Sequence, residues 1–123
     1  MEDTERYYKK LVEALKLISI PLKEQQKYFP EFVDVPFEIT DTFEKAFYLL
    51  PQILEANKID YNVIPNLLRL HNLINLDIYN FDFDSLSSEE LYNSSDWNRM
   101  IILSKDILKI MNIPLEKPDN NYI

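Results

Sequence analysis

The chain contains no glycine in 123 residues, and this absence constrains its fold more than any motif that is present. Glycine normally makes up about 7% of a protein. Without it the chain has no glycine-rich phosphate loop and no Asn-Gly or Gly-Gly hairpin turn, which removes several large enzyme families from consideration. Helices that would end at a glycine must end at asparagine or in solvent. We therefore expect short helices joined by links that contain proline and asparagine.

The size and composition are those of one globular domain. The chain has 46% hydrophobic and 28% charged residues, which is far from a disordered composition. No apolar run approaches the ~20 residues that a membrane span needs, and residues 1–10 do not resemble a secretory signal. The lack of cysteine excludes disulfides and cysteine-bound metal. We expect a cytoplasmic protein with one helical domain over residues 1–114 and a flexible tail over residues 115–123.

Residues 63–75 are apolar around almost the whole circumference of a helix. They read V-I-P-N-L-L-R-L-H-N-L-I-N. A helix that is hydrophobic on all sides is usually buried among its neighbours. We therefore expect an all-α fold, a compact bundle of about five helices in which residues 63–75 form the central helix.

Apolar residues at helical spacing predict a first amphipathic helix over residues 4–18, with Glu13 and Lys16 toward solvent. Pro21 opens a short second helix that reaches Tyr28. Asp41, with Glu44 three residues later, has the capping-box pattern of a helix start.

Further capping signals divide the rest of the chain. Pro51 interrupts the helix that starts at Asp41. Ser87, with a glutamate three residues later, opens a short helix. Ser95 or Asp96 caps the last long helix, which ends before Pro114.

Two stretches do not have a helical pattern. Residues 28–39 contain two prolines, each of which favours an extended residue before it, and several aromatic rings. We expect an ordered, extended proline-aromatic segment that crosses the bundle. Residues 76–86 show a weak alternation of apolar and acidic side chains, and we predict that most of this stretch is irregular.

His71 is the only histidine, so any imidazole chemistry depends on it. A zinc site would need further histidine or cysteine ligands, and the seryl motif G-x-S-x-G is absent. Because His71 lies in an apolar helix, we expect a packed, hydrogen-bonded side chain. No catalytic residue, metal ligand or cofactor is predicted.

The most distinctive feature is an acidic stretch. From residue 70 to residue 98 the chain has six acidic residues and neither Lys nor Arg. A calcium loop that starts at Asp82 fails, because its fifth, sixth and twelfth places are Leu86, Ser87 and Asn93. Paired carboxylates could serve a hydrolase if they converged in a pocket. The simplest alternative is a solvated face with acids at helix starts.

Aromatic rings are interleaved with these acids. Rings supply contact energy in protein interfaces and carboxylates orient a basic partner, although rings also fill cores. The residues that we expect to bind a partner are Asp77, Tyr79, Phe81, Asp82, Phe83, Asp84, Glu89, Glu90 and Tyr92.

The net charge of −8 and the pI of about 4.6 indicate the kind of partner. They count against nucleic acid, which requires basic surface, and favour a basic protein. We expect a non-catalytic binding protein, with an immunity-type inhibitor of a bacterial toxin domain as its specific form. A small enzyme-accessory or assembly protein and a hydrolase with clustered carboxylates are the alternatives. The sequence is compatible with a homo-oligomer and predicts no membrane partner.

Overall fold

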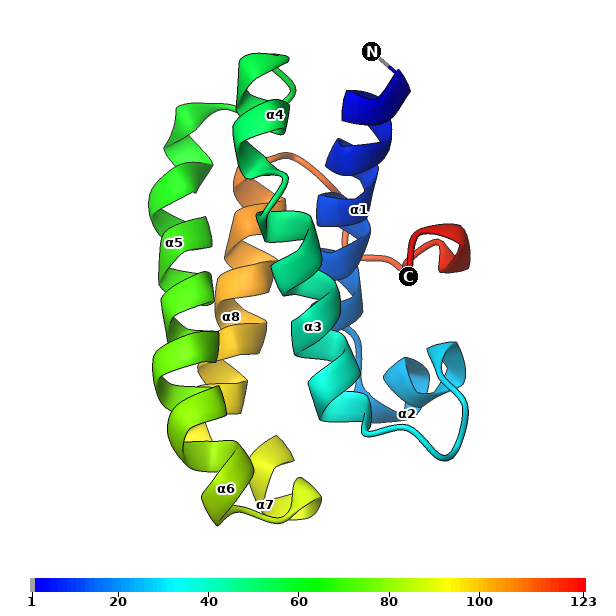
Figure 1. Ribbon diagram of the computed structural model, residues 1–123, viewed down its shortest axis with the longest axis vertical. Helices are drawn as coiled ribbons and strands as arrows, with labels where there is room; N and C mark the ends of the chain where they lie inside the picture. The colour runs from blue at the N-terminus through cyan, green and yellow to red at the C-terminus, as the bar shows by residue number, and fades with distance from the viewer. Residues whose placement is uncertain (1) are drawn as a thin grey trace.

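The computed structural model describes residues 2–123, and the side chains of all of these except Glu2 and Phe81. This part of the chain is 76% helical and has no strand, which confirms the predicted all-α fold (Figure 1). None of its helices combines the length and the apolar character that crossing a bilayer requires. The α-helices are α1 (Glu2–Ser19), α2 (Leu22–Gln25), α3 (Val35–Phe47), α4 (Leu50–Glu55), α5 (Ile64–Asn72), α6 (Phe83–Ser85), α7 (Ser88–Tyr92) and α8 (Ser95–Ile110); a π-helix (Leu73–Asp82) joins α5 to α6, and 3₁₀ turns lie at Gln26–Tyr28, Tyr61–Val63 and Asn120–Tyr122.

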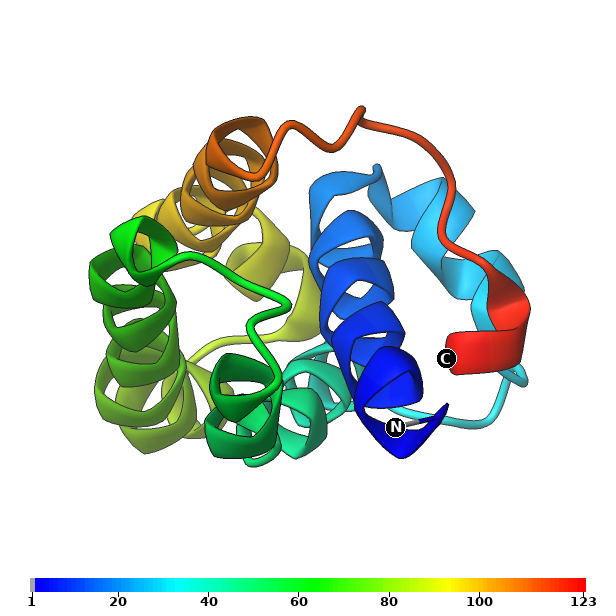
Figure 2. The ribbon, with the colours of Figure 1, turned by 90° about the horizontal axis from the view of Figure 1, so that it is seen from above.

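The helix at the centre of the bundle is α1. It packs against α8, α3 and α4, and its residues Leu11, Leu15 and Ile18 are completely buried (Figure 2). The prediction that residues 63–75 form the central helix is wrong. Their inner face is buried in the core, but Leu68 on the outer face is 46% exposed. An apolar circumference makes a helix suitable for burial on all sides. In the described residues, however, no other helix covers the outer face of this one.

Asparagine replaces glycine at two helix ends, as the composition predicts. Asn57 after α4 and Asn112 after α8 have positive φ angles of 57° and 58°. The amide of Asn112 donates to the carbonyl of Lys109, and that of Ile113 donates to the carbonyl of Leu108. This pair of hydrogen bonds is a Schellman motif, and asparagine tolerates the left-handed conformation that it needs.

The structure confirms the helix boundaries predicted at Pro51 and Ser87. Pro51 lies in the first turn of α4. At Ser87 both hydrogen bonds of the capping box to Glu90 are present. The cap of α8 is Ser94, one position before the predicted Ser95 or Asp96, and its hydroxyl accepts from the amide of Trp97.

The predicted extended segment ends earlier than expected. Residues 29–34 are non-helical, but α3 begins at Val35, and Asp34 caps it by accepting from the amide of Phe37. The expected cap at Asp41 is therefore wrong. Pro36 does not break the helix because it lies in the first turn, where its missing amide hydrogen has no helical partner to lose. Phe32 is 88% exposed, so it does not pin the segment to the bundle.

The prediction that residues 76–86 are irregular is also wrong. The helix of α5 continues through the π-helix into α6. Leu70, Ile74 and Ile78 are buried at intervals of four, which suits the wider turn of a π-helix. The alternation of apolar and acidic residues does not correspond to an alternation of burial, since Leu76 is exposed and Ile78 is buried.

The C-terminal residues 115–123 pass over α1 (Figure 2). The amide of Asp119 donates to the Glu13 carboxylate at 2.7 Å, and the Lys16 ammonium donates to Glu116 at 2.7 Å. Glu13 and Lys16, which were expected to face solvent, are consequently 5% and 8% exposed. This placement differs from the free tail that the sequence suggested, because two charged side chains of α1 find their partners in it.

Candidate protein-binding surface

Two segments of the chain contain neither Lys nor Arg, and the fold brings them to the same end of the molecule. Residues 28–44 and 70–98 together hold eleven of the 21 acidic residues and none of the 13 basic ones. The rest of the chain has ten acidic and 13 basic residues, so the whole net negative charge arises from these two segments. We call them the acidic end; they occupy the lower half of the molecule in Figure 1.

The two segments meet through a cluster of rings. Tyr79 of the π-helix lies edge-on to Phe37 of α3, with 6.2 Å between ring centroids, and packs against Phe83 at 5.0 Å. Its hydroxyl is 2.6 Å from the Thr40 hydroxyl, which itself donates to backbone carbonyls of α3. The acidic end is therefore one surface with a shared aromatic base.

The electrostatic effects of the acids extend across this contact. Burial, with additional repulsion from Asp34, raises the pKa of Tyr92. Burial raises the pKa of Tyr79 as well. The hydrogen bond with Thr40 lowers this pKa, while Asp41, Glu44 and Asp34 act in the same direction as burial. Acids of residues 28–44 thus lie close to rings of residues 70–98, which sequence order alone does not show.

Asp82 lies where burial and neighbouring acids disfavour the charged form of its carboxyl group. Burial raises the pKa of its carboxyl group, and Asp96 and Asp77 raise it further. Its Oδ2 atom is buried and has no hydrogen-bond partner among the described residues. Asp82 belongs to a group of three neighbouring carboxyls and is not a freely solvated charge.

The predicted binding residues fall into two sets. The acids that are exposed can meet a partner directly, whereas the rings pack against the core as partly buried side chains. The side chain of Phe81 lies outside the described residues. Asp84, Glu89 and Glu90 are exposed, while Asp77, Tyr79, Asp82, Phe83 and Tyr92 are partly buried.

Sequence reasoning missed the contribution of residues 28–44. Phe32 is 88% exposed and Phe37 is 43% exposed, so these two rings are more accessible than the rings that were predicted. Beside them in the chain, Glu31 is exposed and Glu38 is partly exposed. The signal that identifies these residues is the second run without Lys or Arg, which the first run overshadowed.

His71 packs as expected. Its ring stacks on Phe47 with a centroid separation of 4.3 Å, and Nδ1 lies 2.8 Å from the carboxylate of Glu44. Asn75 donates both to the other oxygen of Glu44 and to the His71 carbonyl at 2.8 Å. These contacts tie α5 and its π-helical extension to α3, and so fix one segment of the acidic end to the other.

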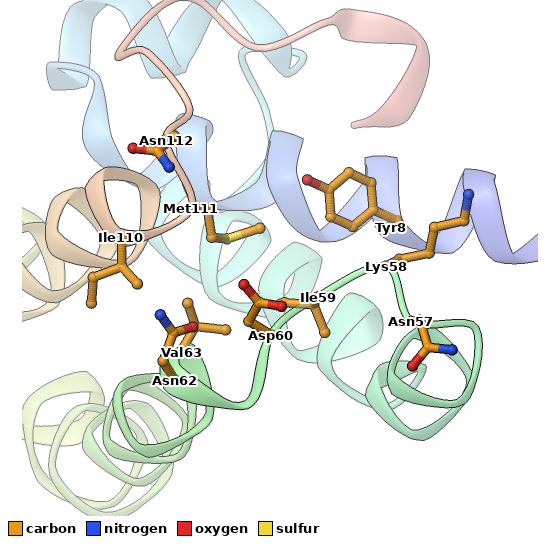
Figure 3. A pocket seen from close by; sticks show the side chains of 10 residues that line it. All are labelled: Tyr8, Asn57, Lys58, Ile59, Asp60, Asn62, Val63, Ile110, Met111 and Asn112. Carbon is orange, nitrogen blue, oxygen red and sulfur yellow. The ribbon is translucent and has the colours of Figure 1, made fainter.

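The pockets differ in how many carboxylates line them. One of about 140 Å³ is bounded by α1, the loop after α4 and the end of α8, and Asp60 is its single carboxylate (Figure 3). Another, of about 430 Å³, lies between α5 and α8 and has Asp77 as its single carboxylate.

Two further pockets have more than one carboxylate: one of about 310 Å³ is lined by Glu38 and Asp41, and one of about 380 Å³ by Glu13, Glu116 and Asp119. In the second of these, Glu13 and Glu116 both form ion pairs with Lys16. Among the described residues no group of three or more potential ligands is placed to hold a metal ion.

Comparisons of the chain with models of known families, with curated proteins and with solved structures find no match in any of the three.

Proposed function

We propose that the protein is a non-catalytic binding protein that holds or blocks a basic protein partner at its acidic end. The observation that carries this proposal is that the entire net negative charge arises from the two segments that also present Phe32 and Phe37. If acidity served solubility alone, there would be no reason for it to be concentrated on one end.

The two kinds of side chain have different tasks in such a surface. Carboxylates steer a basic partner toward the acidic end and exclude acidic proteins. Exposed rings then provide the apolar contact that keeps the complex together. Asp84 and Glu89 are suited to the first task, and Phe32 and Phe37 to the second.

The specific form that we propose is an immunity-type inhibitor of a bacterial toxin domain. Enzymes that act on nucleic acids need basic surface around their active sites. A small acidic protein that covers such a surface blocks substrate access by occupancy and needs no chemistry of its own. An accessory or assembly protein would use the same surface to bind a partner that is not toxic. The toxicity of the partner therefore distinguishes an inhibitor from an accessory protein.

The test is affinity capture with three forms of the tagged protein. They are the natural chain, an Asp84→Lys/Glu89→Lys variant, and a control with the same change in net charge, Glu55→Lys/Asp106→Lys, away from the acidic end. We expect the natural chain and the control to retain the same basic protein, and the acidic-end variant to lose it. Equal retention by both variants would refute the proposed surface.

The captured partner then tests the specific form. Its gene is expressed with and without this chain, and growth is followed. An immunity-type inhibitor predicts that the partner alone stops growth and that this chain restores it. A harmless partner would refute the inhibitor form and favour an accessory role.

A further inference from the structure

An apolar groove lies on the outer face of α5, the π-helix and α8, and the rings of the acidic end do not line it. Leu76 and Ile102 line it, and each is 57% exposed. Leu68, Asn72 and Leu76 recur at intervals of four along one side of the helix, and all three are exposed. An apolar strip with polar groups at its borders is typical of a surface that another protein covers.

Two charged residues at opposite ends of this strip have no partner of opposite charge. Arg69 and Asp77 both line the groove and are eight positions apart. The guanidinium of Arg69 donates to the amide oxygen of Asn66 at 2.7 Å, and among the described residues neither Arg69 nor Asp77 forms an ion pair. The strip therefore has a free cation near one end and a free anion near the other.

We propose that a second copy of this chain covers the groove, related by a two-fold axis that passes near Asn72. A two-fold axis pairs each residue with one equally far from the axis on the other copy. Leu68 then meets the partner's Leu76, and Arg69 meets the partner's Asp77. The pair of leucines is centred on Asn72 and the charged pair on Leu73, about 1.5 Å apart along the helix. One axis between these two residues therefore lets one patch satisfy its own apolar and charged groups.

The distribution of charge favours this occupant. Two copies with a net charge of −8 repel each other in general. The proposed axis crosses the helices, so the acidic ends of the two copies point in opposite directions. Each acidic end then lies nearer the other copy's basic surplus, to which the exposed Lys105 and Lys109 of α8 belong. A parallel arrangement would place the two acidic ends side by side.

The experiment is sedimentation velocity of the full chain over a wide range of protein concentration. We expect reversible formation of a species with twice the chain mass of 14.7 kDa. Leu76→Asp should weaken the dimer by about tenfold or more in Kd, as for a central contact. Leu115→Asp is the matched control, because Leu115 is 58% exposed outside the groove, and should leave the dimer unchanged.

Charge exchange tests the symmetry. Arg69→Asp and Asp77→Arg should each weaken the dimer, and the double variant should restore it because each copy again pairs opposite charges. Circular dichroism of every variant checks that helix content is intact. A chain that stays monomeric throughout, a dimer indifferent to Leu76→Asp, or failure of the double variant to recover would overturn the proposal.

Discussion

The hydroxyl of Tyr79 lies 2.6 Å from the hydroxyl of Thr40, which is 39 positions earlier in the chain. Thr40 donates to the carbonyls of Pro36 or Phe37, so the Tyr79 hydroxyl is the donor to Thr40. This bond joins α3 to the π-helix and thereby unites the two segments of the acidic end.

Tyr79→Phe should therefore destabilise the fold. The substitution removes a partly buried hydrogen bond and leaves the ring contacts in place, so we expect the free energy of unfolding to fall by about 0.5–1.5 kcal/mol. Urea denaturation followed by circular dichroism measures this change. In combination with Thr40→Val, the loss should be smaller than the sum of the single losses, and full additivity would mean that the two hydroxyls do not interact.

Tyr92→Phe should have the opposite effect. The Tyr92 hydroxyl is buried without a hydrogen-bond partner among the described residues, whereas its ring packs edge-on against Trp97 at 5.0 Å. Burial of an unsatisfied hydroxyl costs free energy on folding, and its removal should eliminate this cost of about 1 kcal/mol or more. The same denaturation experiment should show a gain in stability, and a loss would indicate that the hydroxyl has a partner in solution.

Asp82→Asn should stabilise the protein at neutral pH. The folded-state pKa of Asp82 is raised by burial and by Asp96 and Asp77. Folding therefore favours the protonated carboxyl, and the stability that it contributes is lost as the pH rises through the folded-state pKa. The advantage of the variant over the natural chain should be large at pH 7 and should shrink below the ordinary pKa of aspartate. Asp84→Asn, at an exposed position, is the control and should show little change at either pH.

Asn57→Ala and Asn112→Ala should each lower stability by about 1–2 kcal/mol, because alanine in the left-handed region places its β-carbon against the following carbonyl. Glycine has no β-carbon, so Asn57→Gly and Asn112→Gly should be tolerated. Thermal unfolding of the four variants measures the difference. If alanine is tolerated as well as glycine, the two helix ends do not have the conformation described above.

The sequence predicts well the features that depend on neighbouring residues. The asparagine helix ends, the capping box at Ser87 and the break at Pro51 each involve residues within a few positions, and all are present. The prediction of the extended segment failed for a local reason. Pro36 could either follow an extended residue or occupy the first turn of a helix. The Asp34 cap, which accepts from the amide of Phe37, distinguishes the two.

Features that depend on distant residues were not predictable in the same way. Glu13 and Lys16 appear solvent-facing until residues 115–123 pass over them. The acidic stretch after residue 70 was recognised as a candidate site, but its second half, residues 28–44, joins it only through the contacts of Phe37 and Thr40 with Tyr79. A charge pattern along one segment does not show which other segment lies beside it.

The most direct test of the proposed acidic end is the association rate constant with the captured basic partner, measured by stopped flow at several salt concentrations. Steering by charge predicts that Asp84→Lys/Glu89→Lys slows association by about tenfold at low salt and flattens its salt dependence, since surface charges act over ~10 Å at moderate salt. The Glu55→Lys/Asp106→Lys control should change the rate much less. Equal rates and equal salt responses for the two variants would contradict the proposal that the acidic end meets the partner.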